Sequence, residues 1–268
     1  MEDLANAIHE GQVILFVGAS VSRKLGLPSF RELIDHLAKD IGYDPDIYGL
    51  FGDDLALAEY YRIQKGTIGP LRSRLDREWH AKVDIGTSRI HELIIQLKCR
   101  IIYTTNYDRW LENAHEYYHI PYQKVVSVGD IPNLKENRVQ IVKFHGDFDD
   151  DESIVLTETS YFERLSFESP LDIKLRADAL GRTILFIGYS LADINIRYLL
   201  YKIHIQWEKS GFAKIRPKSY IFFPRPNPVQ EKILKERGIT AFVSDTDDPA
   251  QGMEDFLEQL VKKAFSKT

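Results

Sequence analysis

Small and polar residues that could do chemistry follow four short apolar runs of this sequence. The four motifs are Gly18-Ala19-Ser20-Val21-Ser22, Thr104-Thr105-Asn106-Tyr107-Asp108, His145-Gly146-Asp147 and Gly188-Tyr189-Ser190. The two motifs with glycine and serine offer backbone N–H groups to a phosphate where a helix begins. An Asn and an Asp two residues apart can hold a water and a sugar hydroxyl, and a histidine accepts a proton near neutral pH. The motifs therefore indicate phosphate or ribose binding at two places and acid–base chemistry at a third.

Each motif also has a purely structural interpretation, which the residues alone leave open. Glycine and serine are common in any strand-to-helix turn, and Ser190 can cap a helix over 191–207. Asn106 tolerates a left-handed turn, and the primary role we expect for Asp108 is to cap a helix over 109–118. Most single histidines are structural, but a strand end followed by glycine makes His145 a stronger catalytic candidate than its residue type alone.

The first motif does not belong to the standard dinucleotide fingerprint. That fingerprint needs a second strand that ends in Asp or Glu about twenty residues later. Here residues 30–39 are predicted as a helix, because Ser29 and Glu32 form a capping box in front of it. The sequence therefore excludes the standard fingerprint.

One acidic segment has the spacing of a calcium-binding loop, with carboxylates at Asp147, Asp149, Asp151 and Glu158. Glu152 stands where such a loop needs glycine for its sharp turn, and residues 153–156 are predicted as a strand. We expect a solvated acidic hairpin turn here and no metal site.

The elements that position these motifs alternate between short buried strands and helices. This alternation predicts an α/β fold with a doubly wound parallel sheet, in which ligands bind at the carboxyl ends of the strands. The predicted strands are 12–17, 100–104, 140–144, 153–156, 183–187, 220–223 and 240–243, and the main helices are 2–10, 30–39, 109–118, 171–180, 191–207 and 250–266.

Residues 42–98 differ from this pattern because they contain helical stretches and no clear strand. Helical character is found over 54–65, 68–79 and 88–97, and the last has an apolar face. We expect a single domain over residues 1–268 with a helical insertion over 42–98.

The composition narrows the function classes. The chain has 268 residues, a net charge of -5 and one cysteine, Cys99, so it cannot form an intrachain disulfide or a four-cysteine zinc site. The acidic balance argues against nucleic acid as the main partner. No apolar run is long enough to cross a membrane, and the first residues lack the layout of a signal peptide. We expect a soluble cytoplasmic protein.

Taken in order, the motifs resemble the sirtuin-like family. The resemblance rests on the four motifs above and on Gly26-Leu27-Pro28-Ser29-Phe30-Arg31, and it spans roughly residues 12 to 245. Thr104-Thr105-Asn106-Tyr107-Asp108 with Glu112, and Ile154-Val155-Leu156-Thr157 with Tyr161, look like the bacterial antiphage-defence branch.

This resemblance implies a Rossmann-like domain that binds NAD in an extended groove, and it implies a role for each matching residue. Gly18, Ala19 and Ser22 would line a pyrophosphate loop, in which Ser20 stands where family members carry glycine. Phe30 and Arg31 would flank the nicotinamide ribose, and Thr105 belongs to the same NAD-binding set. Asn106 and Asp108 would surround that ribose and the incoming water, and His145 would be a general base or orient the ribose. Gly188 and Ser190 would contact the phosphates or the adenosine ribose.

The resemblance also implies a reaction. Protein-deacylating sirtuins carry a four-cysteine zinc module, which this sequence cannot form. The leading hypothesis is therefore an NAD⁺ hydrolase that releases nicotinamide and ADP-ribose in antiphage defence, with NAD as substrate and no metal. The alternatives are an NAD-dependent protein deacylase and a non-catalytic subunit that senses NAD or ADP-ribose.

The NAD⁺ hydrolase hypothesis also implies a means of regulation. Unrestrained NAD hydrolysis would kill a cell, so we expect a homo-oligomer or a separate regulatory partner such as a translocase-type ATPase. The helical insertion and the helix over 250–266 are candidate interaction surfaces.

Overall fold

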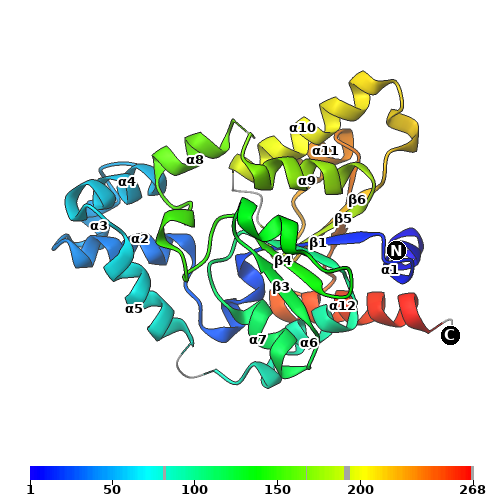
Figure 1. Ribbon diagram of the computed structural model, residues 1–268, viewed down its shortest axis with the longest axis horizontal. Helices are drawn as coiled ribbons and strands as arrows, with labels where there is room; N and C mark the ends of the chain where they lie inside the picture. Colours follow the sequence, from blue (N-terminus) through cyan, green and yellow to red (C-terminus); the bar gives the residue numbers. More distant parts are fainter. Residues whose placement is uncertain (81–82, 167, 190–193, 267–268) are drawn as a thin grey trace.

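The structure is a computed structural model that describes residues 1–80, 83–166, 168–189 and 194–266 (Figure 1). Its described residues form one seven-stranded sheet with the order β3-β4-β2-β1-β5-β6-β7, and every neighbouring pair is parallel. The strands are β1 (Val13–Val17), β2 (Ile101–Thr104), β3 (Tyr122–Val125), β4 (Val139–Lys143), β5 (Thr183–Ile187), β6 (Ser219–Phe223) and β7 (Ile239–Val243). The predicted α/β fold with a doubly wound parallel sheet is confirmed.

Helices cover both faces of the sheet because its strands are apolar on both sides. In β1, Val13, Leu15 and Val17 face one core and Ile14 and Phe16 face the other. The first core includes residues of α1 (Glu2–His9), α6 (Arg89–Gln96), α7 (Trp110–Tyr117) and α12 (Pro249–Phe265), and the second includes residues of α9 (Pro170–Leu180), α10 (Ile194–Ser210) and α11 (Pro228–Glu236).

A separate group of helices lies beyond the carboxyl ends of the central strands, away from both chain termini (Figure 1). It contains α2 (Phe30–Asp40), α3 (Pro45–Tyr48), α4 (Asp54–Lys65) and α5 (Gly69–His80), which share their own apolar core. The backbone N–H of Thr159 donates a hydrogen bond to the Glu59 carboxylate (3.1 Å), which connects α8 (Glu158–Arg164) to α4. We call α2–α5 and α8 the helical cluster.

The predicted insertion over 42–98 does not pack as one unit. α3, α4 and α5 belong to the helical cluster, together with α2, which precedes residue 42. In contrast, Ile90, Leu93 and Ile94 of α6 lie in the first sheet core, where α6 packs against α12. As a domain division, the 42–98 boundary stays a prediction.

Two predicted details of the sheet were wrong. Residues 153–156 form no strand, because a 3-10 turn (Asp151–Ser153) is followed by Ile154 and Leu156, whose side chains enter the core of the helical cluster. The prediction also missed β3, an edge strand whose sequence Tyr-Gln-Lys-Val is not an apolar run. Short 3-10 turns also occur at Ala19–Val21, Arg23–Leu25, Ile85–Thr87, Val128–Asn133 and Ala213–Ile215.

Helix boundaries follow the expected caps. Ser29 and Glu32 form the predicted capping box of α2, and Ser169 with Pro170 opens α9 as expected. Cys99 is buried, and burial raises the pKa of its thiol to about 12. Among the described residues, no helix is long and apolar enough to span a membrane.

Candidate functional site

A cavity of about 560 Å³ lies between the carboxyl ends of the central strands and the helical cluster. We call it the strand-end cavity. Its size is within the range of pockets that take small molecules, and it lies where parallel α/β sheets bind ligands. The predicted site residues that line it are Ala19, Phe30, Thr105, Asn106, Asp108, His145 and Gly188. The predicted residues Gly18, Ser20, Ser22 and Arg31 are not among its lining residues, and Ser190 lies outside the described residues.

Gly18 and Gly188 directly follow the neighbouring strands β1 and β5 and are in contact with each other. The strands β2 to β4 lie on one side of this pair, and β6 and β7 lie on the other. A Cβ on Gly18 would lie 2.5 Å from the Gly188 carbonyl oxygen, and one on Gly188 would lie 2.7 Å from the Gly18 oxygen. Gly188 also has a φ of +76°, which disfavours any side chain. Both positions therefore need glycine for the contact between the two strand ends.

Four backbone amides of the turn after β1 donate hydrogen bonds within the protein. The amide of Gly18 donates to the Ile187 carbonyl (2.8 Å), and that of Ser20 donates to the Gly188 carbonyl (3.2 Å). The amides of Val21 and Ser22 close the 3-10 turn (3.3 and 3.1 Å). These bonds give no support to the predicted role of this turn as a phosphate cradle, which stays a prediction.

Asn106 is held from two sides at the end of β2. Its amide N–H donates to the Thr104 hydroxyl (3.0 Å), which itself donates to the Val17 carbonyl (2.8 Å). Its Nδ2 donates to the Gly18 carbonyl (3.3 Å). The Oδ1 atom is buried and has no hydrogen-bond partner among the described residues. A buried acceptor without a partner is unusual, so this oxygen fits a hydroxyl or water held in the cavity.

Tyr189 joins the second and fourth motifs. Its hydroxyl lies 2.9 Å from the Thr105 hydroxyl and donates to the Val17 carbonyl (3.2 Å). Because the tyrosine has only one hydroxyl proton, Thr105 is the donor of this pair. Tyr189 also lines the cavity.

His145 follows β4 and is one of the residues that line the cavity, although only 2% of it is exposed. The ring meets Tyr161 of α8 edge to face, with centroids 5.4 Å apart. The next residue, Gly146, has a φ of +94°, and a Cβ there would lie 2.2 Å from the Ser153 carbonyl oxygen. This tight turn fixes where His145 sits.

Asp108 precedes the N-cap of α7, which is Arg109 and not Asp108 as predicted. Its Oδ1 still accepts a hydrogen bond from the amide of Trp110 (3.0 Å), the first residue of α7. Asp108 also lines the cavity. Arg31 is different, since its guanidinium pairs with Asp35 (3.3 Å) and with Asp54 (3.1 Å). Its predicted place beside a ribose gains no support from these contacts.

Comparison with known proteins shows the family. Residues 100–242 match the family model described as a SIR2-like domain, which includes the second, third and fourth motifs. This chain belongs to the SIR2-like family. The match begins after the first motif, so residues 18–22 are outside it.

The SIR2-like chain is similar to several curated bacterial proteins. It is 29% identical to the NAD(+) hydrolase ThsA of Bacillus cereus (strain MSX-D12) over 78% of this chain and 43% of that protein. It is 32% identical to the NAD(+) hydrolase ThsA of Enterococcus faecium over 73% of this chain and 41% of that protein. It is 28% identical to defense-associated sirtuin 2 of Bacillus subtilis over 87% of this chain and 23% of that protein. The chain thus spans less than half the length of these relatives.

A solved structure supports the fold. A mutant Sir2 homologue in complex with ADP ribose matches all of this chain and 99% of its own, with a TM-score of 0.51 at 14% identity. At this identity the likeness concerns the fold, and it confirms the predicted Rossmann-like, sirtuin-like architecture.

The SIR2-like site also includes residues that the sequence prediction missed. Asp53, Asp54 and Leu55 at the start of α4 line the cavity, as do Tyr161 and Tyr189. Tyr161 and Tyr189 belonged to the family motifs, which was a usable signal. Asp53 caps α4 by accepting bonds from Leu55 and Ala56 (both 3.0 Å), so the sequence predicted a helix start there but no place in the site.

Proposed function

We propose that this SIR2-like chain is an NAD⁺ hydrolase that cleaves the bond between nicotinamide and ribose and yields nicotinamide and ADP-ribose. The observation that carries the proposal is that Asn106 and His145 line one strand-end cavity, with Asn106 Oδ1 left as a buried acceptor. Relatives named NAD(+) hydrolase support the choice of NAD as substrate.

Cleavage of NAD requires the protein to position the ribose and a water molecule and to supply a base. The positive pyridinium nitrogen of NAD keeps both electrons of the broken C1′–N bond and leaves as neutral nicotinamide. The ribose then resembles an oxocarbenium ion, and the oxygen of a water molecule bonds to C1′ while the water loses a proton. Holding the water and the ribose in one geometry removes much of the entropic barrier.

In this proposal Asn106 positions the water or the ribose, and His145 is the base. The Asn106 carboxamide is fixed by its bond to Gly18, so its Oδ1 accepts a hydrogen bond from the attacking water or from a ribose hydroxyl. His145 accepts the proton that the water or hydroxyl releases and returns it to solvent. Asp108 and Thr105 line the same cavity, and we propose that they contact the ribose.

Phe30, Ala19 and Gly188 complete the NAD-binding surface that we propose. We propose that the lack of side chains at Gly18 and Gly188, where the two strand ends are in close contact, lets the dinucleotide approach the backbone there. We keep Ser20, Ser22, Arg31 and Ser190 as proposed NAD-binding residues, to be tested by substitution.

The biological role we propose is depletion of NAD in antiphage defence, in the cytoplasm. A relative named as a defense-associated sirtuin supports this role. Such an activity needs restraint, so we further propose control by self-association or by a separate partner such as a translocase-type ATPase.

The test is mass spectrometry of NAD products made by the purified chain, with and without an acylated peptide. Equal nicotinamide release in both conditions, with ADP-ribose as co-product, supports hydrolysis. Release that requires the peptide would instead show a deacylase, and tight NAD binding without product would show a sensor.

A further inference from the structure

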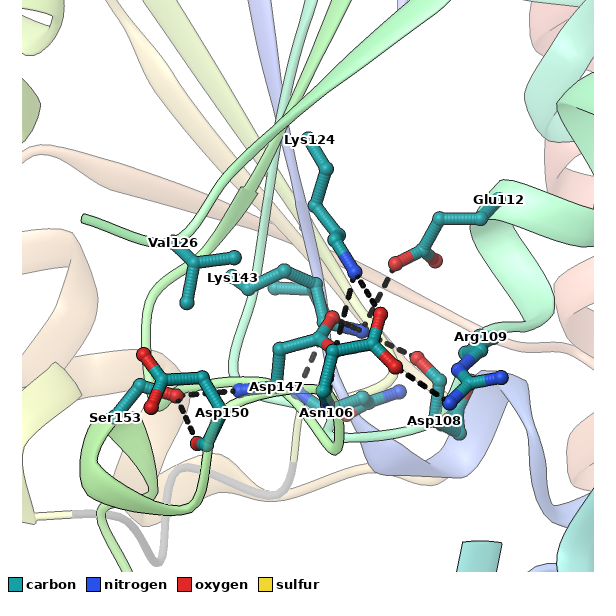
Figure 2. A network of polar contacts seen from close by, with 12 residues as sticks. Asn106, Asp108, Arg109, Glu112, Lys124, Val126, Lys143, Asp147, Asp150 and Ser153 are labelled. Carbon is teal, nitrogen blue, oxygen red and sulfur yellow. Dashed lines mark hydrogen bonds and ion pairs between the residues drawn. The ribbon is translucent and has the colours of Figure 1, made fainter. Parts of the chain in front are cut away.

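A lysine with no exposed side-chain area lies directly beneath the two loops that carry Asn106 and His145. The Lys143 ammonium donates a hydrogen bond to the backbone carbonyl of Asp108. It also lies 3.2 Å from Glu112 Oε1 in α7 and 3.6 Å from Asp147 Oδ2. Figure 2 shows these groups converging from three segments of the chain on one nitrogen atom.

The position of Lys143 in the sheet makes this contact a link between the two loops. Lys143 is the last residue of β4 and is in register with Thr104, the last residue of β2. Asp108, which it binds, is two residues after Asn106, whereas Lys143 itself is two residues before His145. The ammonium therefore bridges the loop after β2 to the turn after β4.

Carboxylates surround the buried ammonium of Lys143. Burial raises the pKa of Glu112, and the nearby Lys143 opposes that rise. Lys124 lies 3.2 Å from Asp147 Oδ1, and its hydrogen bonds to Asp149 and Asp147 raise the pKa of Lys124 although burial acts to lower it. Asp147 thus has a second cation beside it.

Stability alone is a poor reason for such an arrangement. Taking an ammonium and two carboxylates out of water has a high desolvation cost, and apolar replacements of buried ion pairs are often as stable. In contrast, the hydrogen bond from the Lys143 ammonium to the Asp108 carbonyl is directional, so it fixes the distance between β4 and the loop after β2. Apolar packing would not fix that distance.

We propose that Lys143 is a positioning residue that sets the separation between Asn106 and His145 through the Asp108 carbonyl and Asp147. The expected effect of Lys143 on kcat rests on the proposed NAD hydrolysis. The proposed effect of Lys143 on the geometry of the two loops does not depend on that function. Lys143 does not line the strand-end cavity, so it acts through these neighbours.

A competing explanation is that Lys143 only neutralises its buried carboxylates. The two explanations differ for the double variant Lys143→Met/Glu112→Gln, which removes one positive and one negative charge together. If neutralisation is the whole role, this variant regains the activity lost in Lys143→Met. If the bond to Asp108 matters, the variant folds and stays slow. The double variant also gives a folded test molecule should Lys143→Met alone unfold.

The experiment compares wild type, both variants and Lys174→Met as a matched control. Lys174 is also nearly buried and pairs with a carboxylate (Asp178, 2.7 Å), but it lies in α9 and does not line the cavity. We expect both Lys143 variants to lose about 10²-fold in kcat with KM for NAD little changed, since a misplacement of about 1 Å has that effect. We expect Lys174→Met to turn over like wild type.

A second readout, amide hydrogen exchange, does not depend on catalysis. We expect faster exchange at the amides of Asn106, Trp110 and Asp147 in both Lys143 variants, and unchanged exchange there in Lys174→Met. Restored kcat in the double variant, or unchanged exchange at these three amides, would overturn the proposal. If wild type cleaves no NAD, the proposed function fails, and the exchange data alone then decide the role of Lys143.

Discussion

The carboxamide of Asn106 donates a hydrogen bond of 3.3 Å from Nδ2 to the carbonyl oxygen of Gly18. This bond joins the end of β2 to the end of β1 and fixes which way the carboxamide faces. Because the donor side is used by the protein, the acceptor side, Oδ1, is left buried without a partner among the described residues, in a residue that lines the cavity. The contact between the ends of β1 and β2 thus sets the orientation of the Asn106 carboxamide on which the proposed chemistry depends.

Replacement of Asn106 tests this connection. We predict that Asn106→Ala lowers kcat for NAD cleavage by about 10²- to 10⁴-fold, the range lost with a positioned polar or acid–base group. The side chain is small and the cavity is open beside it, so the variant should keep its circular dichroism spectrum. Product formation measured by mass spectrometry checks the rate, and near-wild-type turnover would remove Asn106 from the site.

Replacement of His145 tests the proposed base. We predict that His145→Ala nearly abolishes NAD cleavage while the protein stays folded, because proton acceptance is lost, whereas the fold loses ring packing such as that against Phe144 and Tyr161. His36→Ala is a suitable control, since His36 lies on α2 and is not among the cavity-lining residues. Full turnover by purified His145→Ala would rule out the assignment.

The contact between Gly18 and Gly188 gives a stability prediction. Gly188→Ala places a Cβ 2.7 Å from the Gly18 carbonyl oxygen at a φ of +76°. We expect a loss of at least about 2 kcal/mol in the free energy of unfolding, from strain and overlap together.

Gly181→Ala is the matched control for this substitution. Gly181 ends α9 with a φ of -111°, and a Cβ there meets nothing within 4 Å. Urea denaturation of both variants should show a large loss for Gly188→Ala and a small change for Gly181→Ala. Equal stabilities would mean that the two strand ends are not in close contact.

His91 gives a prediction for pH dependence. It is fully buried, its Nδ1 lies 2.7 Å from the Ser88 hydroxyl, and burial lowers its pKa to about 4, with Asp108 opposing that shift and His115 adding to it. Below about pH 6.5 the unfolded chain takes up a proton at this histidine that the folded chain does not accept until about pH 4. The folded state therefore loses stability as the pH falls through this window.

The size of the effect follows from the pKa difference. Between pH 7.5 and pH 5, His91 should contribute a loss of about 2 kcal/mol in the free energy of unfolding. Urea denaturation of His91→Gln should show a pH-dependent loss smaller by that amount, whatever its stability at pH 7.5. An identical pH dependence in wild type and His91→Gln would show that His91 titrates normally in the folded protein.

Much of the fold was predictable because its signals are local. The apolar runs of β1 and β5 and the caps at Ser29 and Ser169 need no knowledge of distant contacts, and they were placed correctly. β3 was missed because its sequence does not alternate, and it forms an edge strand by pairing with β4. The run at 153–156 was assigned to the sheet because burial in the helical cluster produces the same apolar pattern as burial in a sheet.

The candidate site was predictable only in part. Strand ends placed Asn106, Asp108 and His145 together, since parallel strands end at one edge. Asp53 and Asp54 were missed because they reach the cavity through the packing of α4 on α2, which no local pattern encodes. The link from Lys143 to Asp108 was also hidden, because it depends on the register of β2 and β4.

The most direct test of NAD hydrolysis is a time course of NAD incubated with the purified 268-residue chain and, in parallel, with its His145→Ala variant. Nicotinamide and ADP-ribose are measured by mass spectrometry. We predict equimolar nicotinamide and ADP-ribose from wild type and almost none from the variant. No NAD cleavage by wild type above the level of the variant would contradict the proposed function, as would equal cleavage by both.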